Sequence, residues 1–167
     1  MQNSDVVTIP HFPAIMIYDD AWLNIVVSAD VFSKVAVSAL INPSVFKGDV
    51  LFDANGDKWT YTLVSDGFKN TFLVRLLAKT FYNPRLDATV IWNRLGSYSL
   101  DELKAGINLC VDKDDDIITQ FEEGSVIKAA VDAAASLDEI VVVLNKYVFE
   151  VNEELLWKEQ EAMGRAE

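Results

Sequence analysis

The sequence predicts an α+β domain in which an N-terminal antiparallel sheet precedes C-terminal helices. Short β-rich runs separated by turn residues occupy residues 13–95. The hydrophobic period then changes, because apolar residues recur at helical spacing over residues 97–150. Strands followed by helices, rather than alternating with them, are typical of this fold class.

Length and composition fit one domain. The chain has 167 residues, of which 51% are hydrophobic, so a sizeable core can form. The single cysteine, Cys110, cannot form an internal disulfide, which agrees with a reducing cytoplasm. We expect a cytoplasmic protein, since the N-terminus lacks a signal-peptide pattern and no apolar run reaches the roughly 18 residues of a membrane helix.

The first segments predict a strap and a hairpin. Residues 1–12 are polar and end in closely spaced prolines, which favours an extended strap. His11, the only histidine, is expected to be a turn or packing residue, because catalysis or metal binding would need partners it lacks. Residues 14–18 and 22–27 read as strands, and the two aspartates between them predict a tight turn.

The clearest hairpin follows. Residues 49–52 and 58–64 flank Asn55-Gly56, a dipeptide typical of tight hairpin turns. In the second of these strands three large apolar residues alternate with polar ones and predict one buried face: Trp59, Tyr61 and Leu63.

One more strand is predicted over residues 88–95, with Val90 and Trp92 on the same face. The sheet would then have about five or six strands. Three stretches are left open between helix and strand: residues 31–41, 72–81 and 139–149.

Serine caps mark the helices. The tetrapeptide Ser-Leu-Asp-Glu begins at Ser99 and again at Ser136, and each copy is a capping box in which serine and glutamate satisfy backbone N–H groups. The first helix should end near Asp112, and Ser125 can cap another. Cys110 lies on the apolar stripe of the first helix and is expected to be a core residue. The acidic residues 151–167 predict a helix that frays.

Charge is the strongest global property. The chain has 26 acidic and 14 basic residues, a net charge of −12. Phosphate backbones and anionic membranes repel such a surface, so neither nucleic acid nor membrane is an expected partner. A basic protein partner is favoured. Acidity that serves solubility alone is the alternative.

The acidity is concentrated in residues 112–123, which we call the acidic segment. It holds one lysine and six acids: Asp112, Asp114, Asp115, Asp116, Glu122 and Glu123. If the segment were helical, Ile117, Ile118 and Phe121 would face inward and hold the acids outward as a rigid ridge. Such a ridge would fit a cationic protein cleft, whereas an ordinary solvated linker is the alternative.

The acidic segment also matches the ligand spacing of a calcium loop. Oxygen ligands fall at the required positions: Asp112, Asp114, Asp116, the carbonyl of Ile118, Gln120 and Glu123. Ile117, however, stands where the loop needs glycine, and a β-branched residue resists that turn. We therefore expect no metal and no cofactor.

Catalytic patterns are weak. A glycine-rich phosphate loop is missing, and one histidine and one cysteine cannot build the common zinc sites or triads. Carboxylate pairs are abundant in an acidic chain, so they indicate nothing without spatial information. We expect a protein that is not an enzyme.

Part of the chain resembles a known class. Residues 97–104 (SYSLDELK), residues 114–121 (DDDIITQF), an alanine-rich helix and residues 136–140 (SLDEI) look like small acidic immunity proteins, which are encoded beside bacterial polymorphic or contact-dependent toxins. The resemblance covers about residues 92–147. It implies a cytoplasmic, non-enzymatic inhibitor that binds one toxin domain, often over its active site.

With this resemblance, the acidic segment is the candidate surface for a basic toxin domain. Phe121, Tyr98 and Trp92 are the candidate apolar anchors. An acidic secretion chaperone or adaptor that holds a protein client is the alternative, since such proteins also combine a small α+β fold with a low pI. The oligomeric state is left open.

Overall fold

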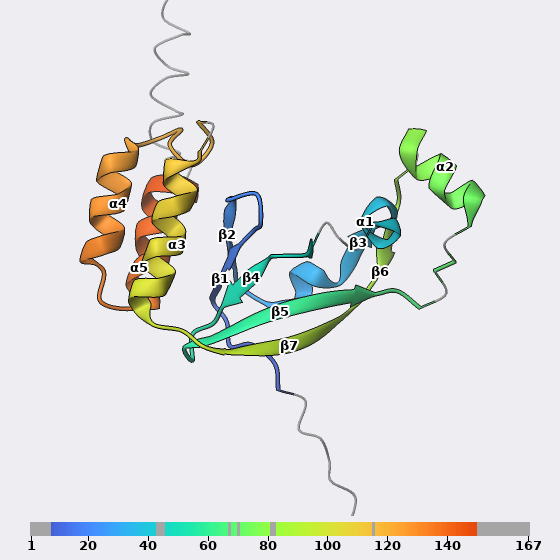
Figure 1. Cartoon of the computed structure of the whole chain (residues 1–167), viewed down its shortest axis with the longest axis horizontal. Coiled ribbons are helices and arrows are strands. Elements are labelled where there is room, and N and C mark those ends of the chain that lie inside the picture. The colour runs from blue at the N-terminus through green and yellow to red at the C-terminus, as the bar shows by residue number, and fades with distance from the viewer. Residues whose placement is uncertain are drawn as a thin grey trace, which may run out of the picture.

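The computed structural model describes most of the chain (Figure 1). The described residues are 8–42, 46–66, 68–69, 71–80, 83–114 and 116–149. The start of the expected strap, the expected C-terminal helix and Asp115 therefore lie outside the described residues.

Five antiparallel strands form the main sheet in the order β2-β1-β4-β5-β7. Their bounds are β1 (Ala14–Ile17), β2 (Leu23–Val26), β4 (Val50–Phe52), β5 (Asp57–Val64) and β7 (Thr89–Ser97). A second, two-stranded sheet pairs β3 (Lys34–Ala36) with β6 (Arg85–Asp87). The predicted α+β class and both predicted hairpins are confirmed.

The helices settle the three ambiguous stretches. The helical elements are the 3-10 turn η1 (Ala29–Phe32), α1 (Val37–Ile41), α2 (Phe72–Thr80), α3 (Leu100–Asp112), α4 (Gly124–Ala133), α5 (Leu137–Leu144) and the π-helical turn η3 (Asn145–Phe149). Residues 31–41 are thus part strand and part helix, whereas residues 72–80 and 139–149 are helical. The β-branched residues of α5 are tolerated because its face packs on the core.

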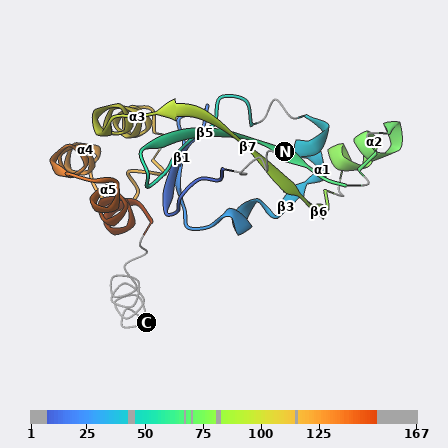
Figure 2. The same cartoon turned by 90° about the horizontal axis from the view of Figure 1, so that it is seen from below.

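The main sheet buries both of its faces over β1, β2 and β4. Ile15 and Leu23 point toward α3, α4 and α5, which form one layer (Figures 1 and 2). Ala14 and Met16 point to the opposite face. Gly106 lets α3 pass close to the sheet, because a Cβ there would lie 2.8 Å from Cδ1 of Ile17.

Aromatic side chains fill the second core. Trp59 and Tyr61 are buried there, and Leu63 and Val90 pack against it, as their alternation predicts. The ring of Phe32 lies 4.9 Å from that of Tyr61 and 5.1 Å, edge to face, from that of Trp92.

The serine half of each capping box is confirmed. Ser99 Oγ accepts the N–H of Glu102 at 3.2 Å, and Ser136 Oγ accepts that of Glu139 at the same distance. The hydrogen bond from the glutamate back to the serine N–H was predicted wrongly. The Glu102 carboxylate pairs with Lys58 on β5 instead. Glu139 accepts the N–H of the residue before the serine, Ala135.

The start of α4 also differs from the prediction. The helix begins at Gly124 with Glu123 at the capping position, so Ser125 lies inside the first turn. The chain is tightly packed at this point, since a Cβ on Gly124 would lie 3.0 Å from Cγ1 of Val111. The helix therefore starts two residues earlier than a Ser125 cap would place it.

Candidate protein-binding surface

The acidic segment is a loop between α3 and α4, and Asp114 organises it from within. One carboxylate oxygen of Asp114 accepts the N–H groups of Ile117 and Ile118, at 3.1 and 2.9 Å. The other accepts the N–H and the hydroxyl of Thr119, both at 2.8 Å. Aspartate competes in this way with helical hydrogen bonding, so the local structure is a capped turn and not a helix.

The apolar residues of this loop do not all face inward, as the helical interpretation required. Ile118 is buried in the core beneath α3, α4 and α5. Ile117 is 56% exposed and Phe121 49% exposed. The predicted inward-facing trio is wrong for two of its three members, because a capped turn points successive side chains in different directions. The loop therefore presents two apolar side chains to solvent.

The carboxylates of the acidic segment have different roles. Asp112 pairs with Lys128 on α4, and Asp114 is turned inward. Asp116 is exposed and takes a positive φ of 67°, a conformation that aspartate tolerates better than most residues. The Glu122 carboxylate accepts the N–H of Glu123, which is itself exposed. Asp116, Glu122 and Glu123 are thus the described acids nearest the exposed apolar pair in sequence.

Two of the carboxylates that a calcium loop would need as ligands have other partners in the structure. Asp112 and Asp114, at the first and third ligand positions, already contact Lys128 and backbone N–H groups. The left-handed turn falls at Asp116 and not at Ile117, where a calcium loop needs glycine. Among the described residues, no three His, Cys, Asp or Glu side chains lie close enough together to hold an ion.

The two other expected anchors lie elsewhere. Tyr98 packs edge to face on Phe52 and donates its hydroxyl to the carbonyl of Asp53 at 2.8 Å. Trp92 belongs to the second aromatic core. Tyr98 precedes the start of α3, and the acidic segment follows its end, about 20 Å away for a helix of 13 residues. The structure therefore does not bring Tyr98 or Trp92 together with Phe121.

Two buried aspartates went unrecognised in the sequence. Asp53 accepts the N–H groups of His11, Asn55 and Asp57 and the indole N–H of Trp59, at 2.8–3.1 Å. This carboxylate ties the strap to the β4–β5 turn. An aspartate two residues before Asn-Gly is a local signal for the turn, but the contact with His11, 42 residues away, has no local signal.

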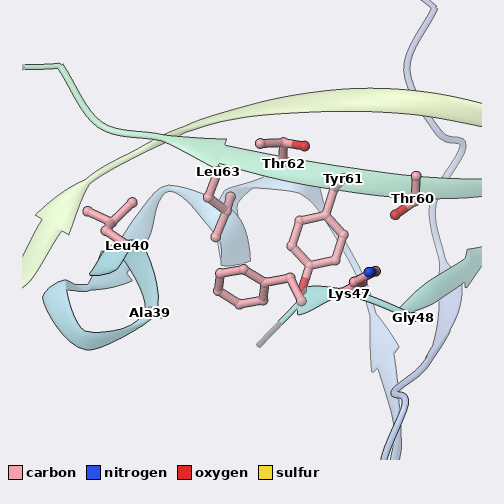
Figure 3. Close-up of a pocket in the computed structure, with 9 residues that line it drawn as sticks. Ala39, Leu40, Lys47, Gly48, Thr60, Tyr61, Thr62 and Leu63 are labelled. Atoms are coloured by element: carbon pink, nitrogen blue, oxygen red, sulfur yellow. The ribbon is translucent and has the colours of Figure 1, made fainter. Parts of the chain in front are cut away.

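The other buried carboxylate contacts a tyrosine that lines a pocket. Asp49 accepts the hydroxyl of Tyr61 at 3.0 Å and the N–H of Asp19 at 3.3 Å. Tyr61 and Leu63 point from β5 into a mostly apolar pocket of about 400 Å³ (Figure 3). Burial raises the pKa of Tyr61, with the Asp49 charge acting the same way, so this hydroxyl remains a donor to Asp49. We assign the pair a structural role.

Cys110 is also structural. Its side chain is buried in the core beneath the helices, as its place on the apolar stripe predicts. Burial raises the pKa of the thiol to about 11, so little reactive thiolate forms at neutral pH.

We expect replacement of Asp114 by alanine to loosen the acidic segment. Hydrogen bonds to a charged acceptor contribute about 1.5–3 kcal/mol, so a loss of about 1–3 kcal/mol in the free energy of unfolding should follow. Denaturant unfolding measures this. Asp116→Asn is the matched control, because asparagine also tolerates a positive φ, and it should change stability by less than about 0.5 kcal/mol.

Protonation of Asp114 at low pH should loosen the acidic segment, as Asp114→Ala does. Burial tends to raise the pKa of Asp114, but the N–H groups of Ile118 and Thr119 outweigh it, and the pKa lies below its ordinary value. A carboxyl with a lowered folded pKa stabilises the fold above the unfolded pKa of about 3.9 and ceases to do so as the pH falls through the folded value. Amide NMR signals of Ile117, Ile118 and Thr119 should therefore shift together below about pH 4. Signals that stay constant there would contradict the cap.

Comparison with known proteins gives no relative. No protein-family model matches the chain, and neither the curated proteins nor the solved structures contain a match. Within the part of the chain that the structure describes, no helix is long and apolar enough to cross a membrane.

Proposed function

We propose that this chain is a non-enzymatic immunity protein that binds and neutralises a basic toxin domain through its acidic segment. One observation supports this most: Ile117 and Phe121 stand half-exposed among carboxylates on a loop held from within by Asp114. The class of protein comes from the sequence resemblance, and the surface comes from this geometry.

The geometry suits binding for two reasons. Apolar side chains surrounded by charged groups form the usual anchor of a protein interface, and the charges increase the rate of encounter with a partner of opposite sign. A loop already ordered by the Asp114 cap loses little conformational entropy on binding. Inhibition would be steric, with the acidic segment covering cationic groups of the toxin.

Co-expression tests the proposal. The protein encoded by the adjacent gene is produced in a bacterial host with and without this chain, and growth is recorded. We expect the wild-type chain to restore growth and to co-purify with its neighbour in a complex that salt weakens. A neighbour that is not toxic, or a toxic neighbour that the chain neither binds nor neutralises, would contradict the proposal. Capture of unfolded secreted proteins would instead favour the chaperone alternative.

A charge-matched pair of variants tests the surface. Asp116→Asn with Glu122→Gln removes two charges from the acidic segment, whereas Asp101→Asn with Asp138→Asn removes two from the first turns of α3 and α5. Only the first pair should slow association at low salt, by about tenfold. Equal slowing by both pairs would assign the effect to net charge alone.

A further inference from the structure

Basic residues are concentrated at one end of this acidic molecule. Residues 31–48 and 67–86 contain six of the fourteen basic residues and none of the 26 acidic ones, and the acids that border them are Asp30, Asp49, Asp66 and Asp87, of which Asp87 lies opposite Lys34 in the β3–β6 pair. The pairing of β3 with β6 and the packing of α1 on α2 hold the described parts of the two stretches together, away from the layer of α3, α4 and α5 (Figures 1 and 2). We call these two stretches the basic lobe. Residues 100–149, at the other end, carry eleven acidic and four basic residues.

The basic lobe exposes an apolar helix face. On α2, Phe72 is 82% exposed and Leu73 64% exposed, and Leu76 is half-exposed. Leu76 lies four residues after Phe72 and three after Leu73, so the three side chains share one side of the helix. Arg75 lies three residues after Phe72, which places a cation at the border of this face. Contiguous apolar groups of this kind mark an interaction surface.

We propose that the apolar face of α2 docks on the acidic segment of a second copy of this chain. Both surfaces expose apolar residues, and their charges are opposite: α2 holds two basic residues and no acid, whereas the acidic segment surrounds Ile117 and Phe121 with carboxylates. The two surfaces lie at opposite ends of one molecule, so they meet only between copies (Figure 1). Pairing α2 with α2 would instead bring like charges together.

This contact joins different surfaces of the two copies, so it is head-to-tail. Such a contact extends into chains or closes into a ring, and it leaves one free surface at each end of an open assembly. Since attraction between exposed charges contributes, the assembly should weaken as salt rises. The inference concerns the chain alone and does not depend on the proposed function.

Sedimentation of the full chain tests the proposal. At about 50 mM NaCl the average mass should rise with protein concentration up to about 0.5 mM, and at about 500 mM NaCl it should fall toward the monomer. Phe72→Ser with Leu73→Ser should weaken the association at least tenfold, and so should Ile117→Ser with Phe121→Ser. Ile91→Ser, on the exposed face of β7, is the control and should leave it unchanged.

Mixing the two double variants gives the sharpest result. The α2 variant keeps its acidic segment and the acidic-segment variant keeps its α2 face, so each variant alone should be a monomer. An equimolar mixture should form a dimer and nothing larger. Far-ultraviolet circular dichroism checks that both variants are folded. A wild-type chain that is monomeric at about 0.5 mM and low salt would overturn the proposal and leave the α2 face to another class of partner. Association that survives in the acidic-segment variant would overturn it in favour of α2–α2 pairing.

Discussion

Replacing Asp53 with asparagine is expected to lower the free energy of unfolding by about 3 kcal/mol or more. Asp53 is 1% exposed and uses both carboxylate oxygens as acceptors. Asparagine keeps one acceptor for the N–H groups of the turn, but its NH₂ group would face the His11 N–H and the Trp59 indole N–H, which are also donors. Each buried donor left without an acceptor costs about 1–3 kcal/mol. Denaturant unfolding at neutral pH measures the loss.

The same substitution at Asp49 is the control and should change stability by less than about 1 kcal/mol. An asparagine there can accept the N–H of Asp19 and donate to the oxygen of Tyr61, so both contacts are kept, and the Tyr61 O–H, which now donates to Asp49, can turn toward the pocket that Tyr61 lines. Burial raises the pKa of Asp49, with the nearby Asp20 and Asp19 charges acting the same way. A carboxyl with a raised folded pKa lowers the stability of the fold as the pH rises and it becomes charged. The free energy of unfolding of Asp49→Asn, relative to that of the wild type, should therefore be highest at neutral pH. Equal losses at the two sites would contradict this account of the buried carboxylates.

Replacing both Ile117 and Phe121 with alanine is expected to weaken binding of the basic partner about 30-fold or more. Anchor residues of an interface each contribute more than about 1 kcal/mol, and these two are the exposed apolar groups of the acidic segment. Stability should change by less than about 1 kcal/mol, because neither side chain is buried. Calorimetry with the purified product of the adjacent gene measures the affinity.

Ile91→Ala provides the comparison for that experiment. Ile91 is 50% exposed on β7 and lies outside the acidic segment. Its loss should leave the affinity unchanged. If Ile91→Ala weakened binding as strongly as the double variant, the anchors would lie on the sheet and not on the loop.

Local patterns predicted most of the fold. Alternation of Trp59 and Tyr61 with threonines identified the buried face of β5, and Ser99 and Ser136 located the starts of two helices. These signals depend on neighbours in sequence, so one sequence suffices to read them. The short strand β3 was obscured because a helix follows it directly at Val37.

The candidate site was less predictable for a physical reason. A helical period assigned inward positions to Ile117 and Phe121, but the Asp114 carboxylate captures the N–H groups that a helix would need. The buried position of Asp53 depends on His11, far away in sequence, and no local pattern reveals such a contact. The distance of Tyr98 from the acidic segment, by contrast, follows from the predicted helix between Ser99 and Asp112, which the structure confirms as α3.

Hydrogen exchange in the complex tests the central claim most directly. The chain is mixed with the purified product of the adjacent gene, at a concentration where the free chain is monomeric, and amide exchange is compared with that of the chain alone. We predict new protection in residues 116–123, around Ile117 and Phe121. Protection confined to the basic lobe or to β7, with residues 116–123 unchanged, would contradict the claim that the acidic segment binds the partner.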